Sequence, residues 1–275
     1  MANAEETAVK DDLRHPPRRK KKKKKITAVT VAQIVFVIAL LIYMEVAVKH
    51  KWVNPVFLAA PSDIIKEGIK ITKDGTLFPH LIISLEEVLA GFGLGALTGI
   101  AVGLIWTLFP KIEEFMSPFC SAIMAIPKVA ILPLLILWFG IGFKSKLVLI
   151  FLFTVFTILF NTVGGAKQCS EEYLKVARVF ETGRVKTVFR VVLPYALTSI
   201  FTGLKLSAAT AMTGVVFSEM QSAKKGLGYL LAESQNFLNT KRLFFLVILV
   251  TVLSVLFVKL FKFLEYITCH KWRKV

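Results

Sequence analysis

Long apolar stretches separated by short polar segments dominate the chain. A helix needs roughly 20 residues to cross a hydrocarbon core about 30 Å thick, and the apolar stretches have about this length. We therefore expect an all-α, polytopic membrane protein with six transmembrane helices. The expected spans cover residues 26–48, 80–109, 115–139, 146–164, 195–218 and 242–266.

A polar stretch between the fourth and fifth spans has the pattern of an amphipathic helix. Ser170 is a favourable N-cap residue, and the two glutamates that follow it suit the positive end of a helix dipole. Leu174, Ala177 and Phe180 then recur every three residues and form one narrow apolar stripe. A short helix between two spans has no core of its own chain for this stripe, so we expect the stripe to lie in a groove of another protein.

The second span contains four glycines at four-residue spacing, which places them on one face of a helix. They are Gly91, Gly95, Gly99 and Gly103. Glycines stacked in this way let a neighbouring helix approach closely. Membrane helices are rich in glycine in general, but four in register favour a packing face, and they say nothing about a solute.

The third span carries two prolines and a lysine that are candidates for a translocation pathway. Pro127 and Pro133 remove backbone hydrogen bonds, which predicts either a bent, pore-lining helix or a kink tolerated within the bundle. Lys128 is a charge in or close to the membrane. It is either a pathway residue or a side chain that extends to the membrane surface.

The fifth span is rich in small residues, among which the hydroxyl-bearing side chains are candidate pathway residues. They are Ser207, Thr210 and Thr213. Core packing is the commoner explanation of such a run. At the outer end of this span, Glu219 is expected to be an external ion-pair partner or part of a gate.

Between the first two spans, residues 49–79 contain a short amphipathic pattern that begins at Pro61. Its apolar side consists of Ile64, Ile65, Ile69 and Ile71. We expect a helix there, lying at the outer membrane surface.

Of the 275 residues, 55% are hydrophobic, and the formal net charge is +17. Residues 1–25 hold many of the basic side chains, including the unbroken lysine run 20–25. A basic run can indicate nucleic acid binding, but its position directly before a span favours a disordered cytoplasmic tail that contacts anionic lipid, without a nucleic acid partner. This tail sets the expected orientation, with both termini cytoplasmic, because the other basic residues divide almost evenly between the two sides.

No catalytic or metal-binding pattern is visible in the sequence. Cys120, Cys169 and Cys269 are widely spaced, and the four histidines are dispersed, so neither type forms a metal-ligand spacing. The chain also lacks the Gly-x-x-x-x-Gly-Lys-Ser/Thr loop that binds ATP phosphates. We therefore expect no catalytic residues, no metal and no cofactor bound by this chain.

Residues 165–194 resemble the cytoplasmic coupling loop of the permeases of binding-protein-dependent ABC importers. The signature of that loop runs Glu-Ala-Ala, three residues, Gly, nine residues, Ile-x-Leu-Pro, and the segment 191–194 (Val-Val-Leu-Pro) fits its end. At the start of the signature, Lys175 replaces the glutamate. Glu181 replaces the glycine, and Gly183 follows two residues later.

The resemblance implies a set of residues that couple the permease to its ATPase. These are Glu171, Glu172, Leu174, Lys175, Val176, Ala177, Phe180, Glu181, Gly183, Leu193 and Pro194. Residues 132–134 (Leu-Pro-Leu) and 137–142 (Leu-Trp-Phe-Gly-Ile-Gly) are similar to the nitrate, sulfonate and taurine branch of these permeases. Glu219 and the segment Gly226-Leu227-Gly228 also resemble elements of the family.

The family resemblance implies a transmembrane domain at residues 26–275 that forms the pathway for a small, anionic solute. The expected partners are a second permease copy in a homodimer, ABC ATPase subunits that bind ATP-Mg, and an extracytoplasmic substrate-binding protein. The expected location is the cytoplasmic membrane of a prokaryote.

Two other classes of protein remain alternatives at this point. An ion-coupled secondary transporter would need buried polar sites near mid-membrane, often in paired inverted halves, and no internal repeat is visible. An integral membrane enzyme would need a convergent set of His, Asp or Glu residues. Neither class requires the amphipathic loop at 165–194.

Overall fold

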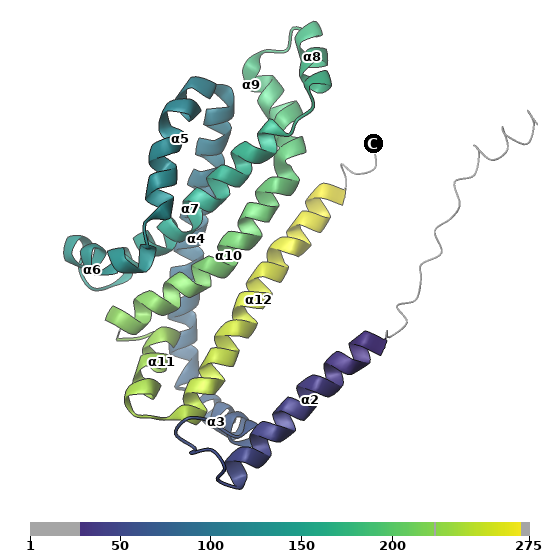
Figure 1. The fold of residues 1–275 in the computed structure, drawn as a ribbon. Coiled ribbons are helices and arrows are strands. Elements are labelled where there is room, and N and C mark those ends of the chain that lie inside the picture. Colours follow the sequence, from purple (N-terminus) through teal and green to yellow (C-terminus); the bar gives the residue numbers. More distant parts are fainter. Residues whose placement is uncertain (1–27, 223, 271–275) are drawn as a thin grey trace, which may run out of the picture.

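The computed structural model describes residues 28–222 and 224–270, and within these ranges every regular element is a helix (Figure 1). The long helices are α2 (Ala28–Lys49), α4 (Leu77–Leu108), α7 (Phe143–Lys167), α10 (Leu193–Ser222) and α12 (Thr240–His270). The shorter ones are α3 (Pro61–Lys73), α5 (Pro110–Ala125), α6 (Lys128–Phe139), α8 (Glu171–Val179), α9 (Arg184–Thr187), the π-helix η1 (Val188–Val192) and α11 (Leu227–Asn236). The tail expected at residues 1–25 lies outside the described residues.

The core of the bundle is built around α7, which packs against α4 on one side and α10 on the other. Val88 of α4, Ile150 and Ile158 of α7, and Ala208 and Val215 of α10 are fully buried in one cluster. Small residues on α4 and α10 let these helices approach α7 closely. The central position of α7 explains why its long apolar run is buried, whereas α12 packs along the side of the bundle, against α10, α11 and α3, and leaves many of its apolar side chains exposed.

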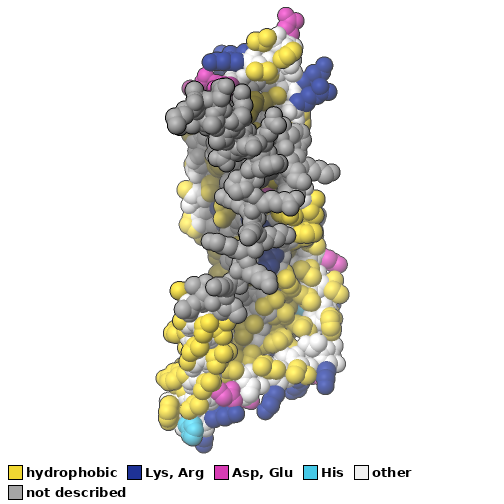
Figure 2. All heavy atoms as spheres, turned by 90° about the vertical axis from the view of Figure 1, so that its right-hand side faces the viewer, with side chains coloured by type: hydrophobic (Ala, Val, Ile, Leu, Met, Phe, Trp, Pro, Cys, Tyr) yellow, Lys and Arg dark blue, Asp and Glu magenta, His cyan; other side chains and the backbone are white. Residues whose placement is uncertain are grey.

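α2 lies apart from the bundle and contacts it only at its C-terminal end, through α3 (Figure 1). Glu45 accepts hydrogen bonds from the Ser62 backbone N–H (3.0 Å) and from Ser62 Oγ (2.7 Å). Most other side chains of α2 are exposed and apolar, and Figure 2 shows hydrophobic side chains over the lower part of this side of the molecule. A helix that is apolar on all its faces is suited to lipid or to a neighbouring membrane helix.

Residues 115–139, where the sequence predicts a bent or kinked third span, form two separate helices. α5 and α6 meet at an angle of 94°, with the break at Ile126 and Pro127. Ile126 is extended (φ −63°, ψ 132°), as expected for a residue before proline, and Pro127 has no N–H with which to continue α5. Pro133, by contrast, lies inside α6 and does not end it. Five described helices are long and apolar enough to cross a membrane, and the bent α5–α6 pair makes up to six.

The polar elements lie at opposite ends of the bundle. α8 and α9 lie at one end, and α3 and α11 at the other (Figure 1). The apolar side expected for α3 is divided in the structure, because Ile64 and Ile71 are buried whereas Ile65 and Ile69 are exposed. α3 therefore packs on the bundle, where Phe245 of α12 lies against Gly68, and it also presents apolar side chains outward.

Candidate functional site

α8 begins where the sequence places its N-cap. Ser170 Oγ accepts a hydrogen bond from the Glu172 backbone N–H (3.3 Å), and Glu171 and Glu172 form the first turn. Arg178 lies in the last turn, so both ends of α8 carry the charge that suits the helix dipole. The segment therefore has the local signals of a short, well-delimited helix.

The apolar stripe of α8 does not face away from the chain as a unit, and this corrects the prediction that its own chain cannot bury it. Ala177 is only 6% exposed, and Leu174 packs against a cluster formed by Ala166, Cys169 and Val192. Phe180 is 77% exposed, because it follows the last helical residue and the chain turns there. Burial also raises the pKa of the Cys169 thiol.

The outward surface of α8 is a second apolar set, which we call the α8 outer face. It consists of Tyr173, Val176, Val179 and Phe180, all of them exposed. Only Val176 and Phe180 of this set were among the coupling residues that the sequence implied. The sequence did contain a signal for this face, because residues 173, 176 and 179 recur every three positions and form a second apolar stripe beside residues 174 and 177.

The chain after α8 reaches α10 through a tight turn and a π-helix. Glu181 has a left-handed backbone (φ 49°), which is the conformation that glycine adopts without strain, and it occupies the position at which the coupling signature has glycine. Gly183 precedes α9. Leu193 and Pro194 follow η1 directly within one continuous helix, and Pro194 has no N–H with which to continue the hydrogen bonding of that helix. Lys175 is exposed on α8.

The four glycines at four-residue spacing lie against α7. A Cβ on Gly91 would meet Ile150 Cβ at 2.6 Å, one on Gly99 would meet the Val155 carbonyl oxygen at 2.8 Å, and one on Gly103 would meet Thr162 Cβ at 2.7 Å. A Cβ on Gly95 would overlap the Thr154 hydroxyl. Gly93, on another face of α4, has no such neighbour within 4 Å.

The candidate pathway residues of the third span occupy the α5–α6 break. Pro127 is exposed and Lys128 is half-buried. Lys128 Nζ donates to the Met124 carbonyl oxygen (3.1 Å) and lies 5.7 Å from the centroid of the Phe153 ring. Pro133 is exposed on α6, so all three residues lie on the side of the bundle where α5 and α6 cover α7 only in part.

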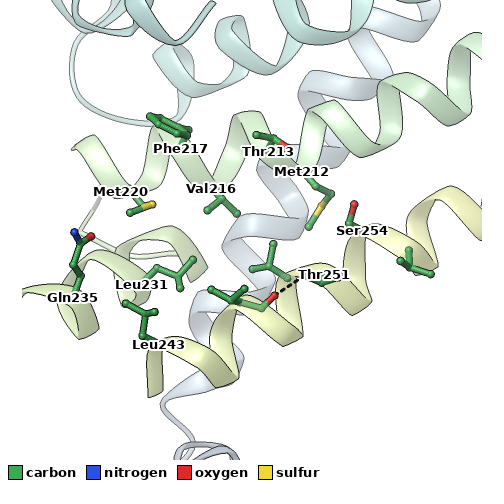
Figure 3. A pocket seen from close by; sticks show the side chains of 13 residues that line it. Met212, Thr213, Val216, Phe217, Met220, Leu231, Gln235, Leu243, Thr251 and Ser254 are labelled. Atoms are coloured by element: carbon green, nitrogen blue, oxygen red, sulfur yellow. Dashed lines mark hydrogen bonds between the residues drawn. The ribbon is translucent and has the colours of Figure 1, made fainter. Parts of the chain in front are cut away.

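The candidates in α10 differ from one another in their surroundings. Ser207 is fully buried and donates to the Thr154 carbonyl oxygen of α7 (3.3 Å), which is a packing contact. Thr210 is exposed and donates to the Ser207 carbonyl oxygen (3.1 Å). Thr213 lines an apolar cavity of about 500 Å³ between α10, α11 and α12, together with Met212 and Met220 (Figure 3). The structure therefore does not bring these three hydroxyl groups together in one polar site.

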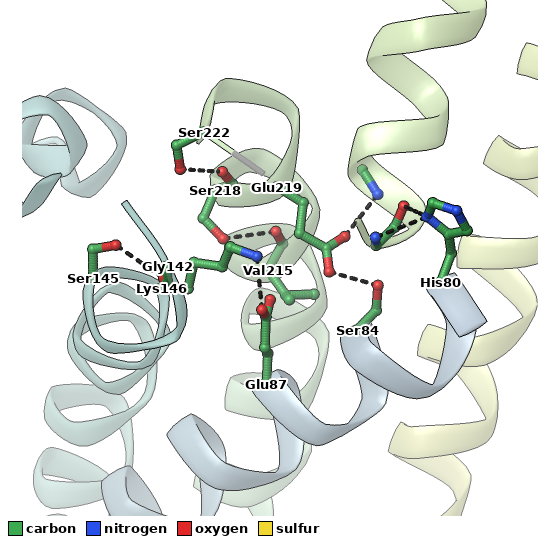
Figure 4. A network of polar contacts seen from close by, with 12 residues as sticks. His80, Ser84, Glu87, Gly142, Ser145, Lys146, Val215, Ser218, Glu219 and Ser222 are labelled. Atoms are coloured by element: carbon green, nitrogen blue, oxygen red, sulfur yellow. Dashed lines mark hydrogen bonds and ion pairs between the residues drawn. The ribbon is translucent and has the colours of Figure 1, made fainter. Parts of the chain in front are cut away.

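Of the two roles that the sequence predicts for Glu219, an external ion-pair partner or part of a gate, the structure contradicts the first. Glu219 is fully buried, and no ion pair to it is found in the described part of the chain. Glu219 Oε1 accepts from Ser84 Oγ (2.6 Å), and Oε2 accepts from the Gly228 backbone N–H (2.7 Å) (Figure 4). Burial follows because α11 folds back over the end of α10 and supplies the Gly228 donor, while α4 supplies Ser84.

The Gly226-Leu227-Gly228 segment makes this fold-back possible. Gly226 has φ 119°, a conformation that side chains other than glycine rarely adopt, and its N–H donates to His80 Nδ1 (3.0 Å). A Cβ on Gly228 would overlap the Val216 carbonyl oxygen of α10. The segment therefore needs both glycines to place α11 against α10.

Sequence reasoning missed a buried ion pair in the same region. Lys146 Nζ of α7 donates to Glu87 Oε1 of α4 (2.6 Å), and both side chains are almost fully buried (Figure 4). Glu87 Oε2 has no hydrogen-bond partner. No local signal identifies this pair, because the two residues are 59 positions apart.

Comparisons with known proteins agree with this arrangement. The family described as "Binding-protein-dependent transport system inner membrane component" matches residues 91–268, from α4 to α12. A putative aliphatic sulfonates transport permease protein of Bacillus subtilis (strain 168) is 32% identical over 221 residues, which cover 80% of each chain. The taurine transport system permease protein of Escherichia coli (strain K12) is 30% identical over 68% of this chain and 70% of its own.

The fold is also similar to that of solved transporters. A crystal structure of an amino acid ABC transporter with histidines matches 72% of this chain and 96% of its own, with a TM-score of 0.59 and 17% identity. This likeness supports the fold, and the family match supports an importer over an ion-coupled secondary transporter. The chain therefore belongs to the binding-protein-dependent transport system inner membrane component family, as the transmembrane permease of an ABC importer.

Proposed function

We propose that two copies of this chain form the translocation pathway for a small anionic solute of the sulfonate type. A substrate-binding protein delivers the solute on the outer side, and separate ATPase subunits that bind ATP-Mg drive import from the inner side. Support for the solute class comes from relatives named for aliphatic sulfonates and for taurine. We place the protein in the cytoplasmic membrane of a prokaryote, with both termini inside and the tail at residues 1–25 on anionic lipid.

The observation that carries the ATPase proposal is the α8 outer face. Four large apolar side chains are exposed there, beside a set of exposed charged side chains on the same short helix, and such a patch is typical of a protein-binding surface. An amphipathic helix of this kind fits the groove of a partner, with one or two aromatic side chains as anchors. Phe180 and Tyr173 are the aromatic residues of this face.

The inner side of α8 supplies the mechanical connection. Leu174 holds α8 to the end of α7 and to η1, which continues directly into α10, and Ala177 is buried on the same side of α8. A displacement of α8 by the ATPase is therefore passed to the packed core through apolar contacts. Lys175 is exposed beside the outer face, and we infer an acidic residue on the ATPase opposite it.

The test is co-purification of the tagged permease with its cognate ATPase, together with solute-stimulated ATP hydrolysis in vesicles. Phe180→Asp places an unpaired charge in an apolar groove, so we expect ATPase binding to weaken by about thirtyfold or more. Phe237→Asp is the matched control, because Phe237 is exposed to the same extent (79%) at the opposite end of the bundle. We expect its ATPase binding to equal that of the unmodified protein.

Full ATPase binding and stimulated hydrolysis by Phe180→Asp would contradict the coupling role of α8. Lys175→Glu tests the charge pairing separately, and we expect weaker assembly although the family signature has glutamate there. If Lys175→Glu binds the ATPase normally while Phe180→Asp does not, the proposed charge pairing is rejected and the apolar anchor is retained. The solute class is tested in the same vesicles with taurine and ethanesulfonate, supplied with the binding protein.

A further inference from the structure

Lys128 is an isolated charge inside a long apolar segment. It is the only charged residue between Glu114 and Lys144. α5 has 16 residues, so at 1.5 Å per residue its far end lies roughly 24 Å from Pro110. Lys128 is half-buried and lies far along the apolar segment from its charged ends, where an unpaired charge is costly and is a sign of function.

No carboxylate pairs with Lys128 in the described part of the chain. Five other lysines there do form ion pairs, namely Lys49, Lys146, Lys167, Lys205 and Lys241. The Lys128 ammonium has one hydrogen bond, to Met124, and a contact with the face of the Phe153 ring. An ammonium carries three N–H donors, so this side chain has donors left for a ligand.

The position of Lys128 at the helix break adds to its positive charge. It is the first residue of α6, and no side chain caps that helix end. The N-terminus of a helix carries a partial positive charge and unpaired N–H groups, which disfavour a cation and favour an anion. The lysine and the helix end therefore reinforce each other, and an anion would neutralise both.

The exposed face of α10 lies close to Lys128 and the N-terminus of α6. A Cβ on Gly214 would meet the Phe153 ring at 2.9 Å, so α10 approaches the same ring that Lys128 approaches from α6. Thr210 is exposed on α10, and its hydroxyl lies 3.5 Å from the Phe153 carbonyl oxygen. Thr210 therefore provides both a neutral hydrogen-bonding group and a place for a chemical probe.

We propose that Lys128 and the N-terminus of α6 form an anion-binding station partway along the translocation pathway. The ligand is a small monoanion that presents sulfonate or carboxylate oxygens. This inference rests on the proposed function, since it assigns the preference for anions to a residue of the permease itself. A single charged station without further ligands binds weakly enough to release the solute onward.

The test measures the electrostatic field at Thr210 and needs no knowledge of the solute. Cys120, Cys169 and Cys269 are replaced by alanine, and Thr210→Cys is introduced into the complete importer in vesicles. The cysteine is modified either by the anionic 2-sulfonatoethyl methanethiosulfonate or by its cationic trimethylammonium analogue. We expect Lys128→Gln, or the second neutral variant Lys128→Met, to lower the ratio of anionic to cationic modification rates about tenfold.

Two controls define the result. Lys128→Arg keeps the charge and should keep the ratio of modification rates. Lys144→Gln removes an exposed lysine at the outer end of α7 and should also leave this ratio unchanged. A ratio that does not respond to Lys128→Gln or Lys128→Met overturns the inference. Protection of the Thr210→Cys variant from both reagents also overturns it, because no pathway then reaches Lys128.

Solute-stimulated ATP hydrolysis separates this inference from the proposed function. If sulfonates stimulate hydrolysis but the ratio of modification rates does not change in the Lys128 variants, the anion station is rejected and the proposed sulfonate import is retained. A ratio that depends on Lys128 without sulfonate stimulation would reject the sulfonate as solute and keep the anion station.

Discussion

Buried carboxylates near the α11 end of the bundle find partners within the same chain. Glu87 and Lys146 form a buried pair, and Glu219 accepts two hydrogen bonds from Ser84 and Gly228. Taking two charges out of water is costly, and removal of one partner leaves the other buried without compensation. These residues therefore hold α4, α7, α10 and α11 together at a point where apolar packing alone would allow other arrangements.

Lys146→Met should destabilise the permease by about 3 kcal/mol, because it leaves the Glu87 carboxylate buried without its partner. The double variant Glu87→Met, Lys146→Met should lie closer to the unmodified protein than either single variant, since no charge remains to be satisfied. The measurement is thermal unfolding of the purified permease in detergent. Lys205→Met is the control, because the Lys205–Glu265 pair (2.8 Å) is partly exposed and should contribute about 1 kcal/mol or less. Additive effects in the double variant would show that the two residues do not act as a pair.

At the scale of the elements, the position of α7 between α4 and α10 organises the bundle. Both neighbours approach α7 through small residues, Gly95 and Gly99 on α4 and Gly203 on α10. The α5–α6 pair, by contrast, breaks at Pro127 and covers α7 only in part. The closely packed part of the permease is thus α4, α7 and α10, and α8 is attached to this part through η1.

Gly95→Leu should destabilise the permease by about 3 kcal/mol, because a side chain at this position overlaps Thr154 of α7 and forces α4 away. Gly93→Leu is the matched control, since it makes the same change on the same helix where no atom lies within 4 Å. Thermal unfolding and assembly with the ATPase are measured for both variants. Equal behaviour of the two variants would mean that the α4–α7 contact does not depend on glycine.

At the scale of the whole molecule, the bundle has two chemically different ends. α8 and the last turns of α12 lie toward one end, and α3 and α11 lie at the other (Figure 1). The proposed ATPase surface and the proposed outer surface are therefore separated by the full length of the spans. Import requires this separation, because the ATPase and the binding protein act on opposite sides of the membrane.

The orientation can be tested with two exposed lysines, Lys175 on α8 and Lys66 on α3. In a background without native cysteines, Lys66→Cys should react with a membrane-impermeant maleimide in intact cells. Lys175→Cys should react only after the membrane is permeabilised, because positive residues of the tail retain that end inside. The reverse pattern of labelling would invert the proposed topology.

The sequence by itself determined the fold class and the family. Apolar stretches of membrane-spanning length predicted an all-α membrane protein, and the family match confirms the importer permease inferred from residues 165–194 and 132–142. These properties are local, since they depend on the length of an apolar run, on helical periodicity and on a motif. For the same reason Ser170 could be placed as the N-cap of α8 in advance.

Only the tertiary structure decided which face of each helix meets which partner. Periodicity put Leu174, Ala177 and Phe180 on one stripe, but docking of α8 on α7 and η1 buries Ala177 and leaves Phe180 exposed. The burial of Glu219 depends on α11 folding back over α10, and Glu87 meets Lys146 only because α4 packs on α7. Such contacts join residues far apart in the chain, so their energies depend on how the helices dock and are absent from any local pattern.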